Sequence, residues 1–502
     1  MTNLIDNTPP SASSSDHAAA EEHKIDVAAV NSGEYRALYK KREQIYPKLV
    51  QGVFRNLKWI AMVVLLAIYY ITPWIRWDRG EGRADQAVMI DFEGRRFYFF
   101  FIELWPQEVY YFAGLLIFAA LAMFLATALF GRVWCGYACP QTVWTDLYIH
   151  VERWIEGDRK DRIKLDHAPM SFSKAAKKVA KHAMWLLIAV ATGGAWVFYF
   201  GDAPTLFHEI FTGQADMVIY LFVGILTFTT YALAGTMREQ VCTYMCPWPR
   251  IQAAMIDKEA LSVTYRADRG EPRGPHKKGT SWEGRGDCID CNQCVAACPQ
   301  GIDIRHGDQL ECINCALCID ACDDIMRKVD RPTGLIAYDT HANVERRQAG
   351  EKPRFNFIRT RTIVYAVVML AIGAVLLVQF LGRSSLQLNI IRDRAPPFVR
   401  LSDGSIRNDY AIKVINRAAE ERDLVLTITG LDNVALNRDN DPAAPDNTII
   451  ITAAPDGVSN VRVHVTAAPG AAEGANNIHF EVRDPETGEV ADSASSFLAG
   501  AP

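Results

Sequence analysis

CIDCNQCVAACP (residues 288–299) and CINCALCIDAC (residues 312–322) each place four cysteines at the same spacing, Cys-x2-Cys-x2-Cys-x3-Cys. Bacterial proteins that carry two [4Fe–4S] clusters use this spacing. Three thiolates on a short loop wrap three corners of one cubane, whereas the fourth lies too far along its helix and binds the other cluster. The predicted ligand sets are Cys288, Cys291, Cys294 and Cys322 for one cluster, and Cys312, Cys315, Cys318 and Cys298 for the other.

Disulfides and zinc are the alternative explanations of these two rows. Zinc needs two cysteine pairs per site rather than rows of four. Disulfides form in oxidising compartments, and the charge pattern described below places this segment in the reducing cytoplasm. One departure from the usual pattern is Asp323-Asp324, which stands where a proline normally follows the last cysteine. Negative charge there favours the oxidised state of the nearby cluster and leaves its ligation intact.

Five apolar runs are distributed along the 502-residue chain on both sides of the cysteine rows. A helix needs ~20 apolar residues to cross a bilayer, and these runs are close to that length. Buried core helices are the alternative, but the runs carry almost no internal charge. The predicted transmembrane helices are 57–77, 109–130, 183–200, 217–236 and 362–381.

The distribution of lysine and arginine orients these helices, because basic residues tend to stay on the cytoplasmic side. The 131–182 connection carries ten and segment 237–361 carries nineteen, whereas 201–216 carries none. The 78–108 loop carries four basic residues, which by themselves do not assign it to one side of the membrane. We therefore expect a bacterial inner-membrane protein with a cytoplasmic N-terminus and a periplasmic segment 382–502.

Two shorter strings repeat each other, CGYACP at 135–140 and CTYMCP at 242–247. Both follow helices expected to run inward, so both are expected at the cytoplasmic face of the membrane. Residues i and i+4 of a helix have Cβ atoms ~5–6 Å apart, which disfavours a disulfide and suits two thiolates on a soft ion such as Cu(I). The candidate catalytic residues and copper ligands are Cys135, Cys139, Cys242 and Cys246. Packing is the alternative role of the two pairs.

Other residues near these strings are not expected to bind metal. Met245 is expected to fill space in the interior. Pro140 and Pro247 are expected to end one turn or start a new helix. Three histidines lack metal-ligand spacing and are expected at interfaces or in loops: His150, His182 and His208.

The two ends of the chain differ in composition from the middle. Residues 1–33 are rich in Ser, Ala, Asp and Glu and lack the apolar region of a signal peptide, so a disordered tail is expected. The net charge of −5 argues against a nucleic-acid partner. Residues 384–502 contain alternating stretches typical of a β-sandwich, namely 410–416, 424–429, 447–453, 461–467 and 477–484.

The sequence thus predicts a multi-domain protein. A membrane domain, 34–256, contains the first four transmembrane helices of an α-helical bundle. A ferredoxin-like α+β module with two [4Fe–4S] clusters, 257–361, precedes the fifth helix. An all-β immunoglobulin-like sandwich, 384–502, follows it and is expected to serve docking or stability.

These features together resemble the FixG/RdxA/CcoG-like accessory proteins of cbb3-type cytochrome c oxidase, over about residues 34–500. Supporting stretches are IYPKLVQGVFRNLKW (45–59), GRVWCGYACPQTVW (131–144) and CTYMCPWPRIQAAM (242–255). The membrane part is also similar to the ferredoxin subunit of periplasmic nitrate reductase systems, which is thought to pass quinol electrons.

The resemblance implies reduction of Cu(II) to Cu(I) before copper is inserted into the oxidase. Implied partners are copper ions, oxidase assembly factors and copper chaperones, with an electron donor that is either quinol or a cytoplasmic reductant. Two alternatives stay open. The protein would relay electrons from quinol to another acceptor, or it would be a scaffold whose clusters serve only structure.

Overall fold

The computed structural model describes residues 44–79, 84–276, 279, 281–418, 420–438, 447–455 and 457–500. The tail predicted at 1–33 lies outside the described residues. The chain divides into two compact units, one ending at Leu376 and one beginning at Leu377. The membrane part and the ferredoxin-like part both lie in the first of these units.

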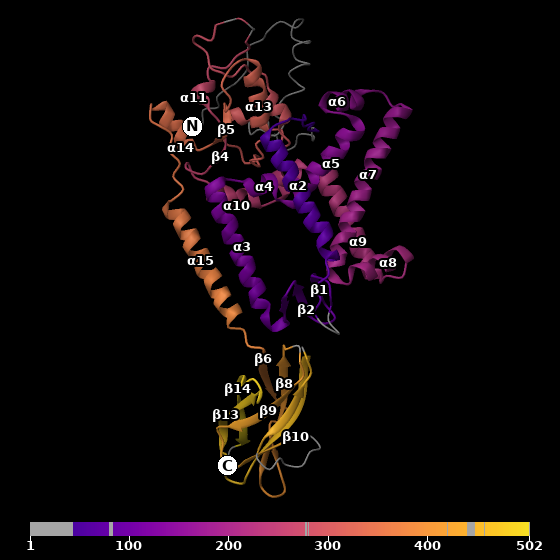
Figure 1. The fold of residues 1–502 in the computed structure, drawn as a ribbon, viewed down its shortest axis with the longest axis vertical. Helices are drawn as coiled ribbons and strands as arrows, with labels where there is room; N and C mark the ends of the chain where they lie inside the picture. Colours follow the sequence, from indigo (N-terminus) through magenta and orange to yellow (C-terminus); the bar gives the residue numbers. More distant parts are fainter. Residues whose placement is uncertain are drawn as a thin grey trace, which may run out of the picture. The chain divides into compact units, whose positions relative to one another are not determined.

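Among the described residues, five helices are long and apolar enough to cross a membrane, as predicted. Their bounds are Val53–Trp74, Val109–Phe130, Phe172–Phe200, Met217–Met237 and Thr360–Leu381. The third begins at Phe172 instead of 183, because its first turns are a charged helical extension that carries Lys174, Lys177 and Lys178. Figure 1 labels the α-helical parts of these spans α2 (Val53–Ile71), α3 (Val109–Phe130), α7 (Phe172–Val197), α9 (Met217–Thr230) and α15 (Thr360–Leu381).

Short helices join the long ones at the end of the bundle that carries the cysteine-rich module (Figure 1). They are α4 (Val133–Tyr137), α5 (Pro140–Glu156), α6 (Arg159–His167), the π-helices η5 (Tyr231–Met237) and η6 (Val241–Met245), and α10 (Trp248–Met255). The opposite end of the bundle carries a three-stranded sheet and a short helix, which the sequence did not predict: β1 (Val88–Asp91), β2 (Arg96–Phe99), β3 (Ile102–Leu104) and α8 (Ala203–Thr212).

A buried charge network fixes the short helices to the bundle. Glu152 of α5 is fully buried and pairs with Arg162 at 2.5 Å and Arg238 at 2.9 Å. Lys181 of α7 lies 3.4 Å from the same carboxylate. Removing one partner of such a buried network leaves an uncompensated charge and costs roughly 3–5 kcal/mol.

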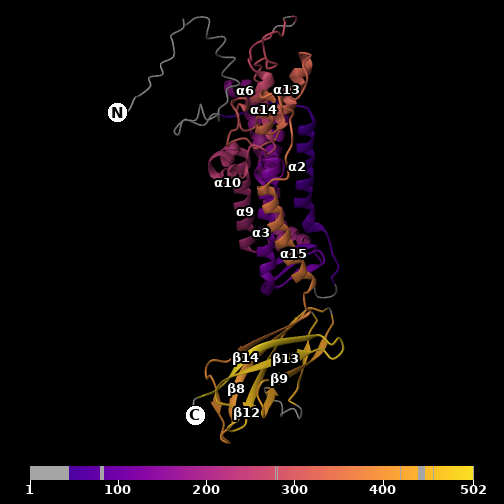
Figure 2. The same ribbon diagram turned by 90° about the vertical axis from the view of Figure 1, so that its left-hand side faces the viewer.

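The cysteine-rich module is built on one antiparallel pair of strands, β4 (Ser262–Tyr265) and β5 (Ile336–Asp339). A helix begins within each cysteine row, α12 (Gln293–Ala297) in the first and α13 (Leu317–Lys328) in the second. The helices α11 (Ala267–Gly270) and α14 (His341–Gln348) complete this α+β arrangement, which is near the helix α2 in Figure 2.

One carboxylate attaches this module to the first transmembrane helix. Asp320 of α13 accepts hydrogen bonds from the backbone N–H groups of Phe54 at 3.3 Å and Arg55 at 2.7 Å. These groups belong to the first turn of α2, whose N–H groups have no partner inside the helix. A β-carbon on Gly52 would lie 2.2 Å from Asp320 Oδ1, so a glycine is required there. Asp320 thus caps α2 from 266 residues away.

The second unit is a sandwich of two antiparallel sheets, as predicted, with strand order β10-β12-β8-β6 facing β11-β9-β13-β14. The strands are β6 (Leu386–Arg392), β7 (Val399–Arg400), β8 (Ile406–Asn416), β9 (Arg422–Thr429), β10 (Val434–Arg438), β11 (Ile449–Ala453), β12 (Gly457–Ala467), β13 (Gly474–Arg483) and β14 (Val490–Gly500). Alternate residues of both sheets, such as Ile412, Val463 and Phe480, are fully buried and form one core.

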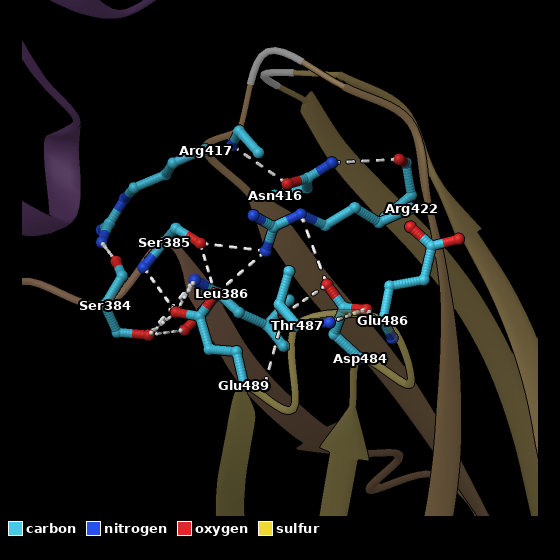
Figure 3. Close-up of polar contacts among 12 residues, drawn as sticks. Ser384, Ser385, Leu386, Asn416, Arg417, Arg422, Asp484, Glu486, Thr487 and Glu489 are labelled. Carbon is cyan, nitrogen blue, oxygen red and sulfur yellow. Dashed lines mark hydrogen bonds and ion pairs between the residues drawn. The ribbon is translucent and has the colours of Figure 1, made fainter.

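The start of this unit is held by a single carboxylate (Figure 3). Glu489 accepts hydrogen bonds from the backbone N–H groups of Ser385 at 2.7 Å and Leu386 at 3.1 Å. It also accepts from the hydroxyl of Ser384 at 2.8 Å and from Arg422 at 3.0 Å. The chain that leaves α15 is therefore bound to the turn between β13 and β14 as soon as it enters the sandwich.

Candidate electron-transfer site

The fold brings together the first predicted set of four cysteines. Cys322 in α13 lies beside Cys294, Cys291 and Cys288 of the other row. Burial, followed by the proximity of these thiols, raises the pKa of Cys322. Cys291 is the exposed member of the set, and the other three are buried.

The second predicted set is also assembled. Cys298, the last cysteine of the first row, lies beside Cys315 and Cys312. Burial, with a smaller contribution from these thiols, raises the pKa of Cys298 to about 12. Burial likewise raises the pKa of Cys318, which lies beside the same three cysteines.

Both rows use the same backbone conformation between their cysteines. Asp290 and Asn292 have φ of 55° and 55°, and the matching Asn314 and Ala316 have φ of 52° and 59°. Left-handed residues on either side of the second cysteine curl each loop tightly, and Asn and Asp tolerate that conformation better than most residues. The two rows are therefore structural repeats as well as sequence repeats.

The surroundings of these cysteines fit iron–sulfur clusters. A cavity is lined by Cys294, Cys298, Cys312, Cys315 and Cys318, together with apolar residues such as Ile302 and Ile304. All twelve cysteines of the chain are described, and all are free thiols. Clusters are held by four cysteine thiolates each, in apolar surroundings that tune their potential. The donor set, its grouping and the cavity match that requirement.

The two shorter strings have closely similar backbones at their second cysteine. Cys139 (φ −62°, ψ 128°) follows α4 and precedes α5, whose first residue is Pro140. Cys246 (φ −79°, ψ 122°) follows η6 and precedes α10, next to Pro247. Each proline thus stands at a helix start, as predicted. The expectation that each pair lies on one helical face is wrong, because the second cysteine sits at an extended break between two helices.

The four thiols of the two strings converge. Burial, then the thiol of Cys139 and more weakly that of Cys246, raise the pKa of Cys135 to about 12, against an opposing effect of Arg132. Burial and the thiols of Cys139, Cys135 and Cys246 raise the pKa of Cys242 to about 12. We call Cys135, Cys139, Cys242 and Cys246 the thiol quartet. Cys135 and Cys242 are neutral thiols at neutral pH, so an ion that binds them displaces protons.

The first of the two strings, CGYACP, lies directly against the second cysteine row. A β-carbon on Gly136 would lie 2.7 Å from the carbonyl oxygen of Ile313 and 3.1 Å from Cα of Cys315. Cys135 shares one buried apolar cluster with Ile313 and Cys315. The hydroxyl of Tyr137 donates to the carbonyl of Cys315 at 3.1 Å. The middle of CGYAC is thus in backbone contact with a predicted cluster loop.

Arg132 stands between the two sets of sulfur atoms. Its guanidinium donates to the carbonyl oxygens of Leu310, of Cys312 at 3.3 Å and of Pro249 at 2.8 Å. Burial lowers the pKa of Arg132, whereas the nearby Cys312 and Cys135 raise it. Sequence reasoning singled out neither Gly136 nor Arg132, although both lie in the quoted stretch GRVWCGYACPQTVW.

The structure shows the surroundings of the other residues that the sequence analysis considered. His182 Nδ1 lies 2.8 Å from the hydroxyl of Tyr231, and His150 packs edge-on against Trp59. Met245 is exposed rather than buried, so the expectation that it fills the interior is wrong. Within the described ranges, no three His, Cys, Asp or Glu side chains are arranged to hold a single metal ion.

Comparisons with known proteins agree with this geometry. Residues 237–341 match a 4Fe-4S dicluster domain, 112–159 match a 4Fe-4S binding domain, and 376–500 match the IG-like fold at the C-terminus of FixG. The nitrogen fixation protein FixG of Rhizobium meliloti is 49% identical over 93% of this chain and 95% of its own length. The chain belongs to the FixG family.

Two further relatives extend the match within this family. RdxB of Cereibacter sphaeroides is 50% identical over 86% of this chain and 91% of its own length. RdxA of the same organism is 46% identical over 92% of this chain and 98% of its own length. Two iron–sulfur domains and five apolar helices make this FixG-family chain an iron–sulfur protein of the electron-transfer type, and the helices indicate a membrane location.

Proposed function

We propose that this chain transfers electrons from two [4Fe–4S] clusters to copper, reducing Cu(II) to Cu(I) for the assembly of a cbb3-type cytochrome c oxidase. The observation that carries the proposal is the contact of Gly136 with Ile313 and Cys315. It places soft thiol ligands against the loop of a predicted electron carrier. A thiol site alone reduces Cu(II) only by oxidising its own thiols to a disulfide, whereas a neighbouring cluster supplies the electron and leaves the thiols free to bind Cu(I).

The cysteine rows and the thiol quartet have separate roles in this proposal. The two sets of row cysteines, headed by Cys288 and Cys312, hold the clusters, which supply single electrons when bound. Copper is the substrate and binds thiols of the thiol quartet, although no three of these four described side chains form a ready-made metal site. Because thiolates select Cu(I), binding stabilises the reduced ion and makes the reduction more favourable.

The reduction balances with one electron and the protons of the thiols that bind. Each Cu(II) takes up one electron from the protein and becomes Cu(I), and each thiol that becomes a ligand releases its proton. Cys135 Sγ lies 3.1 Å from Oε1 of Gln252, an acceptor that orients the thiol. The carbonyl of Cys135 accepts from the hydroxyl of Thr142 at 2.6 Å, which fixes the backbone next to the sulfur.

We place the protein in the bacterial inner membrane with both sets of cysteines on the cytoplasmic side and the sandwich in the periplasm. Support comes from the basic residues, which concentrate in 131–182 and 237–361 and are absent from 201–216. Such an orientation also keeps all twelve cysteines in a reducing compartment.

The test uses full-length protein purified without oxygen, reduced with dithionite and freed of excess reductant. Cu(II) is added, and the absorbance of the clusters is followed together with Cu(I) captured by a chromogenic chelator. We expect one Cu(I) for each electron that the clusters lose. Reduced clusters that stay reduced in the presence of Cu(II) would reject the proposal.

The role of the thiol quartet needs its own variants. Replacing all four cysteines with Ala is expected to slow Cu(I) formation at least about tenfold while the cluster spectrum is kept. Thr243→Ala, which alters the second string without removing a thiol, is the matched control. Equal rates for the quartet variant and this control would exclude the thiol quartet as the copper site.

A further inference from the structure

A second cavity, separate from the one among the row cysteines, opens beside the second row. Its volume is about 530 Å³, within the range of about 300–1,000 Å³ that small-molecule sites occupy. The two cavities share one lining residue, Cys312. A molecule bound here would therefore lie one residue away from the predicted cluster, on the far side of Cys312.

Ion pairs surround this cavity and hold its walls. Lys258 Nζ lies 2.7 Å from Glu345, and His341 Nε2 lies 2.6 Å from Asp308. A third pair joins Asp257 to Arg359 at the start of α15. All of these residues except Arg359 line the cavity. The pairs tie the loop after α10, the helix α14 and the second cysteine row together, so the cavity is a built part of the fold.

Besides the charged residues, the lining contains apolar and neutral polar groups. Ala253, Ile256 and Leu310 offer apolar contacts, and Ser262, Gln309 and Asn314 offer hydroxyl and amide groups.

We propose that this cavity binds the ring of a small two-electron reductant, of the dihydroflavin or hydroquinone type, and that electrons enter the protein here. An iron–sulfur cluster accepts one electron at a time, so a donor must release its electrons singly. Rings of these two types do so, whereas nicotinamides donate hydride. The side chains of Ala253, Ile256 and Leu310 suit the faces of such a ring, and the amides of Gln309 and Asn314 suit its carbonyl and N–H or O–H groups.

The step is balanced by the two clusters and by water. The reduced ring loses two electrons and two protons and becomes the oxidised ring. Each cluster accepts one electron. The protons pass to the His341–Asp308 pair, whose side chains are 34% and 54% exposed and exchange with solvent. The reduced ring is the electron donor for the proposed copper reduction. Only the later transfer of the electrons to copper rests on that proposed function.

The experiment uses the full-length, cluster-loaded protein and two chemically distinct rings. In one arm, oxidised FMN is titrated and its fluorescence anisotropy is recorded, and photoreduced FMN is then mixed with oxidised protein in a stopped-flow instrument. In the other arm, decylubiquinol is the reductant and decylubiquinone competes with FMN. We expect saturable binding and a reduction rate that saturates with the concentration of one ring. Saturation with FMN assigns the dihydroflavin type, and saturation with decylubiquinol assigns the hydroquinone type.

A neighbouring pair of alanines on α10 provides the matched variants. Ala253→Trp fills the cavity, whereas Ala254→Trp places the same side chain at an exposed position that does not line it. Only Ala253→Trp is expected to lose saturable binding and to slow reduction by the ring at least tenfold, with dithionite reduction unchanged in both. Rates linear in both rings, or equal binding in the two variants, would overturn the inference. Binding and cluster reduction are measured without copper. A negative result in the copper test therefore does not change how this experiment is interpreted.

Discussion

A β-carbon on Gly136 would lie 2.7 Å from the carbonyl oxygen of Ile313, closer than β-carbons approach other atoms in folded proteins. The repeated thiol string and the second cysteine row are therefore in contact through a position that only glycine fills. The proposed electron route crosses this contact.

Gly136→Ala is expected to move the string away from the row. We expect overpacking to destabilise the protein by roughly 1–3 kcal/mol and electron transfer from reduced protein to Cu(II) to slow. Thermal unfolding and stopped-flow reoxidation measure the two effects. Gly194→Ala in α7 is the control, because nothing lies within 4 Å of its β-carbon position. If both variants reoxidise at the wild-type rate, the contact is not on the electron route.

In the predicted arrangement, the last cysteine of each row binds the cluster that the other row holds. Cys322→Ala is expected to remove the cluster of the first row, and Cys298→Ala the cluster of the second row, each with loss of half the iron. Iron analysis and electron paramagnetic resonance of reduced protein check this. The signal left in one variant should be the signal lost in the other. Loss of the same signal in both would contradict the crossed arrangement.

Two buried arginines are expected to tune the two clusters separately. Arg132 lies near Cys312, and Arg305 lies near Cys294. A positive charge stabilises the reduced cluster, so Arg132→Met should lower the potential of the second-row cluster by tens of millivolts, in order of magnitude, and Arg305→Met that of the first. Redox titration of each signal measures the shift, and Arg132→Lys should restore most of it. Equal shifts of both clusters in either variant would show that the effect is not local.

The sandwich is expected to lose stability in acid through Glu489. Burial alone raises the pKa of Glu489, but hydrogen bonds from Ser385, Ser384 and Arg422 outweigh it and lower the pKa from 4.5 to about 2. A carboxylate with a depressed folded pKa stabilises above its unfolded pKa and loses that stabilisation as pH falls from 4.5 to about 2. Because the side chain is 25% exposed, we expect about 1–2 kcal/mol.

Pepsin cleavage of the full-length protein between pH 4.5 and 2 measures this change. Glu489→Gln should be cleaved faster than wild type at the upper end of the range and equally fast at the lower end. Glu473→Gln, at an exposed position of the same unit, should follow wild type throughout. A constant difference between Glu489→Gln and wild type across the range would show that the effect is not due to ionisation.

Cysteine spacing, apolar runs and alternation are local patterns, and the sequence predicted the features that such patterns specify. Cysteine spacing predicted the two sets that the fold assembles, and apolar runs predicted the five long helices. Alternation predicted five strands of the sandwich but missed β6, β7, β10 and β14. The missed β14 is the stretch VADSASSFLAG, rich in Ala, Ser and Gly, whose pairing with β13 overrides its weak propensity.

Only the tertiary structure decided how the chemistry is connected. Convergence of Cys135 with Cys242 and Cys246, the contact of Gly136 with Ile313, and the capping of α2 by Asp320 all join residues more than 100 positions apart. No periodicity in the sequence carries such information, because these contacts depend on how the helices pack and on where one helix ends and the next begins. The sequence by itself predicted the ligands of the clusters, and the fold decided that the string around Gly136 lies beside the second cysteine row.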